Sequence, residues 1–246
     1  MHFLRRFLIL LFNVAIIENA FAQFNDSIYH YLHYAATGVI NKTNTSNSFL
    51  LSNGFRFQVK KKRVSLNNNN SFVYGEQQKR ITNRDLTSSL DFNYQPGKQR
   101  FYYWGLINYD KSYSLKVNNR LQTGVGVAYS IIDKPASFIN ISDGILYEKA
   151  NLKLTDITRD VYETFRNSFR LRYKFTIKEI IVINGTNFYQ PSLNDGNDYV
   201  IQLANNLSIK LNKWLSFTTA ATYNKVQRTH RENLLVTFGI SAEKYF

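Results

Sequence analysis

The sequence offers few residues that could act as a catalytic base. Beyond the first 22 residues the histidines are His30, His33 and His230, and the chain has no cysteine. A lipid-modifying enzyme would pair a histidine with a serine and a third polar group. His230 lies within QRTHREN and has no recognisable serine partner motif. We therefore interpret His230 as a solvated loop residue and predict no catalytic site.

Metal and nucleotide sites are equally poorly supported. Residues three apart on a strand point to opposite faces, so His30 and His33 could not share a metal in an extended segment. NDGND at 194–198 resembles half of a calcium-binding loop but lacks the downstream acidic residue at the required spacing. No phosphate-binding or dinucleotide-binding fingerprint is present. The sequence thus predicts neither a metal nor a cofactor.

Basic residues form the strongest constellation. The chain has 31 Lys and Arg against 17 Asp and Glu, a formal net charge of +14. Such a balance often indicates nucleic-acid binding, but the first 22 residues indicate export, and an exported protein does not meet nucleic acid. The cations therefore need another partner. Those that alternate with apolar neighbours are Arg56, Lys60, Arg120, Arg170, Arg172 and Lys174.

Export is indicated by the first 22 residues. They combine a basic start, an apolar run over 7–17 and the small-x-small triplet Ala20-Phe21-Ala22. This pattern is typical of a cleaved secretory signal peptide, because the apolar run is too short for a spanning helix. We therefore expect a signal peptide at 1–22 and a mature domain at 23–246. No later segment approaches the roughly 18 apolar residues of a transmembrane helix.

The mature sequence alternates apolar and polar residues with a period of two, which indicates strands with two unlike faces. In 48–60, for example, Phe55 and Phe57 alternate with Arg56 and Gln58. Short connections such as KKR alternate with longer ones such as GEQQKRITNR and EKANLKLTDITRDVYET, as in membrane barrels with short periplasmic turns and long external loops. We expect twelve strands, at 29–41, 48–60, 64–75, 85–95, 99–110, 119–132, 137–148, 166–177, 179–189, 199–211, 215–225 and 234–246.

Aromatic residues cluster near the ends of these segments, as expected of rings at two lipid–water boundaries. An unpaired strand edge is unfavourable in hydrocarbon, so the last strand must pair with the first. The sequence thus predicts an all-β, transmembrane, antiparallel up-and-down barrel of about 12 strands. A soluble β-sandwich does not account for the alternating loop lengths. The aromatic residues are Tyr94, Phe101, Tyr103, Tyr129, Phe175, Trp214 and Phe246 at one end and Phe49, Tyr74, Tyr109, Tyr147, Phe165, Tyr199 and Tyr223 at the other.

Inside such a barrel the basic set has two interpretations. A charge on the lipid face near the midplane costs roughly 2–4 kcal/mol, so inward placement is expected of any charge in a spanning strand. The cations could pair with Asp91 or Glu243 and form a plugged, rigid barrel. They could instead line a narrow channel that prefers anions, because a ring of guanidinium groups lowers the barrier for negative solutes. The candidate lumen cluster is Arg56, Arg120, Arg170, Arg172 and Lys174.

Two details of the alternation carry further expectations. Gly124 and Gly126 face inward on 119–132, where they could let a large neighbouring side chain or an arginine lie flat across the wall, or simply permit strand curvature. LNNNNS at 66–71 places Asn68 and Asn70 on the apolar face. The alternation gives no reason for these two asparagines.

The end of the chain resembles the C-terminal assembly signal of bacterial outer-membrane barrels, in which apolar residues alternate before a final phenylalanine. The resemblance implies insertion by the barrel-assembly machinery. Lys244 departs from it, although a lysine near the interface can reach water. The residues that fit are Phe238, Ile240, Ala242 and Phe246.

A longer stretch, QRFYYWGLINYDKSYSLKVNNRLQTGVGVAYSIIDKPASFINISDGILYEK, resembles the central block of the salt-induced outer-membrane protein family, also called domain of unknown function 481. The resemblance covers most of the mature chain, but the first hairpin has NKTNTSN where relatives often have a glycine–asparagine turn. It implies an outer-membrane barrel and no established activity. The shared features are an aromatic-rich strand ending near Asp110, then Arg120, Gly124, Val125, Gly126 and Tyr129, and finally Gly144 before Tyr147.

Together these patterns predict an outer-membrane barrel of a diderm (Gram-negative) bacterium that is structural or a narrow passive channel. An anion-preferring, porin-like channel is the first alternative, and a lipid-modifying enzyme is the second and less favoured one. The expected partners are outer-membrane lipid, the barrel-assembly machinery and small anionic solutes, but not nucleic acid.

Overall fold

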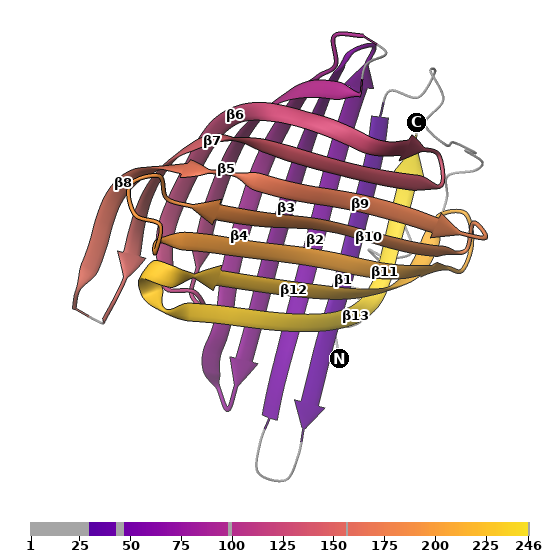
Figure 1. Ribbon diagram of the computed structural model, residues 1–246. Helices are drawn as coiled ribbons and strands as arrows, with labels where there is room; N and C mark the ends of the chain where they lie inside the picture. The colour runs from indigo at the N-terminus through magenta and orange to yellow at the C-terminus, as the bar shows by residue number, and fades with distance from the viewer. Residues whose placement is uncertain (1–29, 43–46, 98–99, 156, 246) are drawn as a thin grey trace.

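The computed structural model describes residues 30–42, 47–97, 100–155 and 157–245, which form one antiparallel sheet (Figure 1). The expected signal peptide at 1–22 and the final Phe246 lie outside the described residues. No helix in the described ranges is long and apolar enough to cross a bilayer. The elements are β1 (His30–Lys42), β2 (Asn47–Lys61), β3 (Val64–Gln77), β4 (Arg80–Tyr94), β5 (Phe101–Ser112), β6 (Val117–Lys134), β7 (Ser137–Lys153), β8 (Arg159–Asn167), β9 (Phe169–Ile177), β10 (Ile181–Pro191), β11 (Tyr199–Lys210), β12 (Leu215–Val226), the 3-10 helix η1 (Gln227–Thr229) and β13 (Arg231–Tyr245).

The sheet is closed, because β1 pairs with β13 on one side and with β2 on the other. β8 and β9 both pair with β7 in one unbroken register, in which Ile145 lies opposite Asn167 and Ser142 lies opposite Arg170. Only Ser168 separates β8 from β9, so the two form a single strand of the wall. The closed, antiparallel, twelve-stranded barrel predicted from the sequence is confirmed.

Apolar side chains face outward and polar side chains face inward along most of the wall. On β13, Phe238 and Ile240 are 53% and 55% exposed on the outside, whereas Thr237 and Ser241 are buried inside. Inward hydroxyls bridge neighbouring strands; the Oγ1 of Thr37 donates to the Oγ1 of Thr237 over 2.9 Å. This division is expected of a barrel with hydrocarbon outside, because lipid offers polar groups no partners.

The two ends of the barrel differ in their connections. We call one end the loop rim: it holds the turns β1–β2, β3–β4, β5–β6, β7–β8, β10–β11 and β12–β13. We call the other the terminal rim: it holds the remaining turns, the start of β1 and the end of β13. The loop rim is the side on which the sequence predicted long external loops.

Most of the residues predicted to form long loops are paired strand instead. β4 begins at Arg80 rather than at 85, and β8 begins at Arg159 rather than at 166. The β3–β4 connection is a two-residue turn at Gln78 and Lys79, with φ of 50° and 63°, a left-handed geometry that suits the twist of a tight hairpin. The strands continue beyond their predicted ends because the antiparallel ladder is formed by backbone N–H and C=O groups. The polar segments therefore remain paired.

The interior is narrow enough for side chains to meet across it. In Figure 1 the front layer formed by β6, β7 and β9–β13 crosses over β1–β4 behind it. The Nη1 of Arg170 on β9 lies 3.1 Å from the Oδ1 of Asp91 on β4, which belongs to the opposite layer. Two small apolar clusters also lie inside: Leu115, Val117, Ala150, Leu152 and Val226 at the loop rim, and Trp104, Leu106, Ala128 and Leu146 in the middle of the barrel.

Candidate functional site in the barrel lumen

The five cations of the predicted lumen cluster all occupy inward positions, but the structure does not bring them together. Arg120 and Arg170 are buried among partners, whereas Arg56 and Lys174 are exposed in the lumen. The register explains the inward placement: Arg56 lies opposite the inward His33, and Arg172 lies beside Arg170 with one residue between them. The lumen therefore contains two different charged regions.

The first region is an ion-pair cluster, which we define as Asp110, Arg120, Glu148, Arg166, Asp198 and Arg228. Arg166 on β8 is its centre. The Nη2 of Arg166 lies 2.8 Å from the Oε1 of Glu148 and 3.0 Å from the Oδ1 of Asp198, and the Arg166 side chain is 0% exposed. Its Nη1 also donates to the backbone carbonyls of Gln190 and Asp198. A guanidinium held in this way is both neutralised and immobile.

Arg120 extends the cluster toward β5. Its Nη2 lies 2.8 Å from the Oδ2 of Asp110, with the two side chains 2% and 6% exposed. Gln122 lies two residues further along β6. Its side-chain amide donates to Glu148 over 2.7 Å and to Gln190 over 3.2 Å. Because Gln190 belongs to β10, this amide joins strands that are not neighbours in the wall. The cluster thus extends inside the barrel from β6 to β10.

Arg228 joins the cluster to the loop rim. Its guanidinium stacks 3.8 Å from the ring centre of Tyr162, and it forms ion pairs with Asp198 at 2.7 Å and Asp160 at 2.8 Å. Burial alone would lower the pKa of Arg228, but hydrogen bonds to these two carboxylates raise it above its usual value. Arg228 therefore stays charged and holds η1 against the β10–β11 connection.

The loop rim is closed by contacts between opposite sides of the wall. The Oγ1 of Thr229 in η1 donates over 3.1 Å to the backbone carbonyl of Leu115, in the β5–β6 connection. Leu115 in turn packs in one apolar cluster with Leu152 and Val226. Since β6 and β12 stand on opposite sides of the barrel, these contacts cover the mouth between them.

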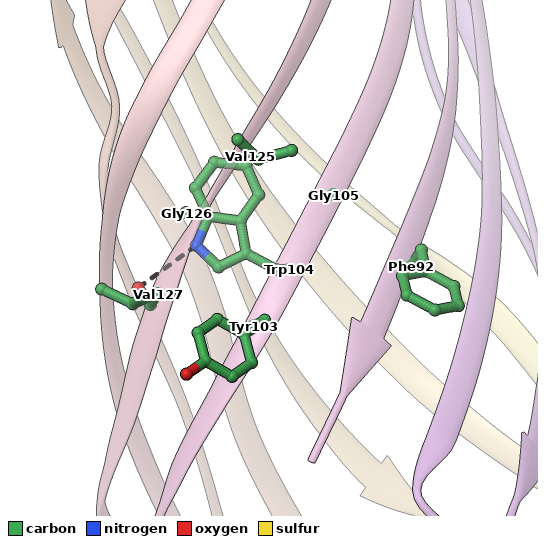
Figure 2. Close-up of a pocket in the computed structure, with 7 residues that line it drawn as sticks. All are labelled: Phe92, Tyr103, Trp104, Gly105, Val125, Gly126 and Val127. Atoms are coloured by element: carbon green, nitrogen blue, oxygen red, sulfur yellow. Dashed lines mark hydrogen bonds between the residues drawn. The ribbon is translucent and has the colours of Figure 1, made fainter. Parts of the chain in front are cut away.

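Trp104 and Arg170 fill the middle of the lumen, and Figure 2 shows the indole against the wall at Gly126. A Cβ added at Gly126 or Gly144 would lie 2.5 Å from the Trp104 ring, so only glycine admits the indole there. The Nε1 of Trp104 donates to the backbone carbonyl of Val127 over 3.2 Å, and the Arg170 guanidinium lies 5.3 Å from the ring centre. The expectation that Gly126 lets a large side chain lie flat is confirmed; the space at Gly124 is filled by Leu146.

The second charged region is a basic basin toward the terminal rim, which we define as Arg56, Arg172, Lys174 and Lys210. Lys174 interacts electrostatically with Arg56, Lys210 and Glu243. The guanidinium of Arg56 donates to Asn69 over 2.7 Å, and that of Arg172 lies 5.9 Å from the ring centre of Phe138. No described carboxylate forms an ion pair with Arg172, Lys174 or Lys210.

The expected acidic partners are only partly those of the structure. Asp91 pairs with an inward cation, as the sequence suggested, and that cation is Arg170. Glu243 instead accepts a hydrogen bond from Tyr31 over 3.3 Å, and no ion pair joins it to a described cation. Three central residues were not among the predicted candidates: Glu148 ends the expected strand 137–148, Arg166 begins the expected strand 166–177, and Asp198 lies in the connection before 199–211. Following the alternation to the ends of 137–148 and 166–177 would have placed Glu148 and Arg166 inward.

The histidines lie apart from one another. His30 stacks outward on Phe57 at 6.3 Å, and His33 faces inward beside Tyr31, so the two occupy opposite faces as predicted. His230 is exposed at the end of η1, and no hydrogen bond joins its side chain to a described residue. Within NDGND, Asp195 accepts from the backbone of Asn197 and Asp198 belongs to the ion-pair cluster. The described residues contain no group of three potential metal ligands.

Comparison with solved structures places the fold among outer-membrane barrels. The NanC porin matches with a TM-score of 0.50 and 9% identity, over 87% of this chain and 99% of that one. The translocator domain of the autotransporter NalP from Neisseria meningitidis matches with a TM-score of 0.48 and 10% identity, over 97% and 93%. The KdgM porin matches with a TM-score of 0.40 and 11% identity, over 86% and 98%. At these identities the likeness concerns the fold alone.

Family assignment is more specific. The model of the family described as "Protein of unknown function, DUF481" matches residues 35–235, so the chain belongs to this family, as its resemblance in the central block indicated. A comparison with curated proteins finds no match. The chain is thus an outer-membrane-type β-barrel of a family without an assigned activity.

Proposed function

We propose that this chain is a closed barrel of the outer membrane that, at rest, passes little or no ionic current. The observation that carries the proposal is the ion-pair cluster, in which Arg166 is held by Glu148 and Asp198 at full burial. An ion cannot pass a lumen that is filled by immobile side chains unless those side chains move. The contact between Thr229 and Leu115 adds a second obstruction at the loop rim.

Conductance across a planar lipid bilayer tests this proposal directly. The purified mature protein is expected to insert without producing current steps, while its unboiled form migrates as a folded barrel on a denaturing gel. Arg228→Ala should then introduce brief openings, because it frees η1 from Asp160 and Asp198. Steady, open steps in every insertion of the wild-type protein would contradict a closed resting state.

A matched control is available at the same rim. Arg231 is an exposed arginine at the start of β13, and no ion pair joins it to a described residue. Arg231→Ala removes the same charge from the same rim without loosening η1. It should therefore leave the bilayer current at the wild-type baseline.

A second candidate function is an anion-preferring passive channel that opens when the loop rim moves. The basic basin favours it, because Arg172, Lys174 and Lys210 meet no described ion-pair partner and would attract anions that enter at the terminal rim. In the Arg228→Ala background, reversal potentials in a salt gradient should indicate anion preference. Adding Arg172→Glu and Lys174→Glu should shift the preference toward cations, whereas Lys178→Glu in the β9–β10 turn should not. An unchanged reversal potential would exclude the basin as a selectivity element.

We also propose that the barrel resides in the outer membrane of a diderm bacterium, surrounded by outer-membrane lipid. Phe238 and Ile240 face outward on β13, and β13 closes the sheet on β1, as an assembly signal at the end of the chain requires. Deleting Phe246 should reduce recovery from outer membranes of the folded form that resists detergent until it is boiled. Undiminished recovery would argue against recognition of this end by the barrel-assembly machinery.

A further inference from the structure

Five polar side chains form an unexpected group on the outer surface of β1–β4. The register places them there: Asn70 lies opposite the outward Phe55 and also opposite Ser88, and Asn68 lies opposite Phe57. Tyr34 also lies opposite Phe55, from the side of β1. We call this group the outer polar array; it consists of Tyr34, Asn53, Asn68, Asn70 and Ser88.

The outer polar array lies midway along the outward rows rather than at their ends. On β3 the outward residues are Val64 and Leu66 before the two asparagines and Phe72 and Tyr74 after them. Apolar neighbours flank the other members as well, for example Leu86 and Leu90 around Ser88 on β4. The array therefore falls within the hydrocarbon depth of a membrane, where polar groups are rare and face protein rather than lipid.

The array is bonded internally but not fully. Ser88 donates to the Oδ1 of Asn70 over 2.8 Å, Asn70 donates to Asn68 over 2.6 Å, and the Tyr34 hydroxyl donates to the Oδ1 of Asn53 over 2.8 Å. Asn68 donates to the backbone carbonyl of Ser89 over 3.4 Å. Each amide group carries two N–H donors. Both donors of Asn53 and one each of Asn68 and Asn70 therefore have no acceptor among the described residues.

Two other outward polar contacts of the described wall are smaller. Tyr173 donates to Asn205 over 2.8 Å, and Asn167 donates to Asp143 over 2.8 Å, each as a single pair of side chains. The outer polar array instead extends over four adjacent strands. It also borders a surface of small side chains, because the outward residues beside Asn53 on β1 are Ala36 and Gly38. A flat patch with unused donors is suited to close contact with another protein wall.

We propose that a second copy of this chain packs against the outer polar array within the membrane, related by a twofold axis. Lipid tails cannot supply acceptors at this depth, so the occupant has to be protein. The array carries unused amide donors together with carbonyl and hydroxyl acceptors, so it is complementary to itself. A twofold contact pairs each group with its counterpart and needs no second surface. This inference is independent of whether the lumen conducts.

Cysteine cross-linking in membranes tests the proposal cleanly, because the chain has no cysteine of its own. Single variants Asn53→Cys, Asn70→Cys and Ser88→Cys sample different distances from the twofold axis. At least one should give a disulfide-linked product of twice the monomer mass upon mild oxidation. Leu207→Cys is the matched control, because Leu207 is an outward residue on β11 that is 43% exposed and far from the array.

A second, quantitative test measures how the loss of an amide donor changes the dissociation constant of the dimer. Energy transfer between labelled wild-type copies, followed as lipid dilutes the protein in vesicles, yields the dimer dissociation constant. Each hydrogen bond lost within a bilayer changes such a constant by roughly threefold, and twofold symmetry makes each substitution worth about tenfold. Asn53→Leu and Asn70→Leu should each weaken the dimer by this factor and keep the folded barrel that resists detergent until it is boiled, whereas Asn205→Leu should not weaken the dimer.

Two results would overturn the proposal. The first is cross-linking from the array no higher than from Leu207→Cys, together with a monomer at every protein-to-lipid ratio. The second is a cross-link in outer membranes to a product of a different mass, with no homodimer from purified protein. That product would mean that another protein covers the array.

Discussion

The ion-pair cluster and the basic basin occupy the same lumen and obey the same inward rule, yet they differ in every other respect. In the cluster, Arg120 and Arg166 are matched by Asp110, Glu148 and Asp198 at close range. In the basin, Lys174 meets two other cations and a single carboxylate, without an ion pair. Lipid outside forces a charge inward, but only the opposite wall decides whether that charge is neutralised.

This contrast separates a structural role from a role in contacting solutes. A buried charge that loses its partner is strongly destabilising, so the cluster is expected to resist change. Charges in a wet, exposed region contribute little to stability and remain available to ions that enter. Trp104 and Arg170 lie between the two regions. The Arg170 guanidinium lies over the Trp104 ring, and that ring lies against Gly126 and Gly144.

The largest expected effect comes from the centre of the cluster. Arg166→Leu leaves Glu148 and Asp198 buried without their cation, so the free energy of unfolding should fall by about 3–5 kcal/mol. Urea unfolding from lipid vesicles, followed by tryptophan fluorescence, measures it. Lys149→Leu is the control: Lys149 pairs with Glu163 on the same two strands, but the two side chains are 58% and 52% exposed. Lys149→Leu should change the free energy of unfolding by about 0–1 kcal/mol. An equal loss in the two variants would contradict the difference between buried and exposed ion pairs.

An intermediate effect is expected at the boundary between the regions. Gly126→Ala places a Cβ against the Trp104 ring and the backbone of Asp143, which should lower stability by about 1–3 kcal/mol. Gly105→Ala on the neighbouring strand is the control, because its Cβ would meet its nearest atom at 3.9 Å. In a Trp214→Phe background, the emission of Trp104 should shift only in the first variant. Equal emission spectra and equal free energies of unfolding in the two variants would show that the backbone around Gly126 adjusts without displacing the indole.

The smallest effect is expected in the basin. Lys174→Gln removes a cation that is repelled by Arg56 and Lys210, so stability should stay within about 0.5 kcal/mol of the wild type or rise slightly. The same urea titration checks this. A loss close to that of Arg166→Leu would show that the basin is a second structural cluster with partners that the described residues do not reveal.

Much of the barrel could be predicted from the alternation alone. Arg56, Arg120, Arg170 and Lys174 all lie inward, because the period of two fixes the face of each residue once a neighbour is known. The extent of the strands could not be predicted in the same way. The segment 148–164 contains too many charges to suggest a membrane strand, yet β7 runs to Lys153 and β8 begins at Arg159. Backbone pairing continues beyond the bilayer, where side-chain polarity no longer limits it.

The pairings inside the lumen also lay beyond the sequence. Asp91 was a reasonable partner for some inward cation, but nothing in the pattern selected Arg170, which reaches it from β9 across the lumen. The outer asparagines were visible in the sequence as a breach of the alternation. Their hydrogen bonds to Ser88 and to each other required the register of β3 against β4.

The sequence by itself determined that this chain is a closed barrel, because a period of two with apolar residues on one side has a stable solution in lipid only when every edge is paired. It also determined which side chains point inward. The tertiary structure decided which of those side chains meet, since contacts across a lumen depend on barrel shape and on the stagger of distant strands. That decision separates the neutral plug near the loop rim from the uncompensated cations near the terminal rim.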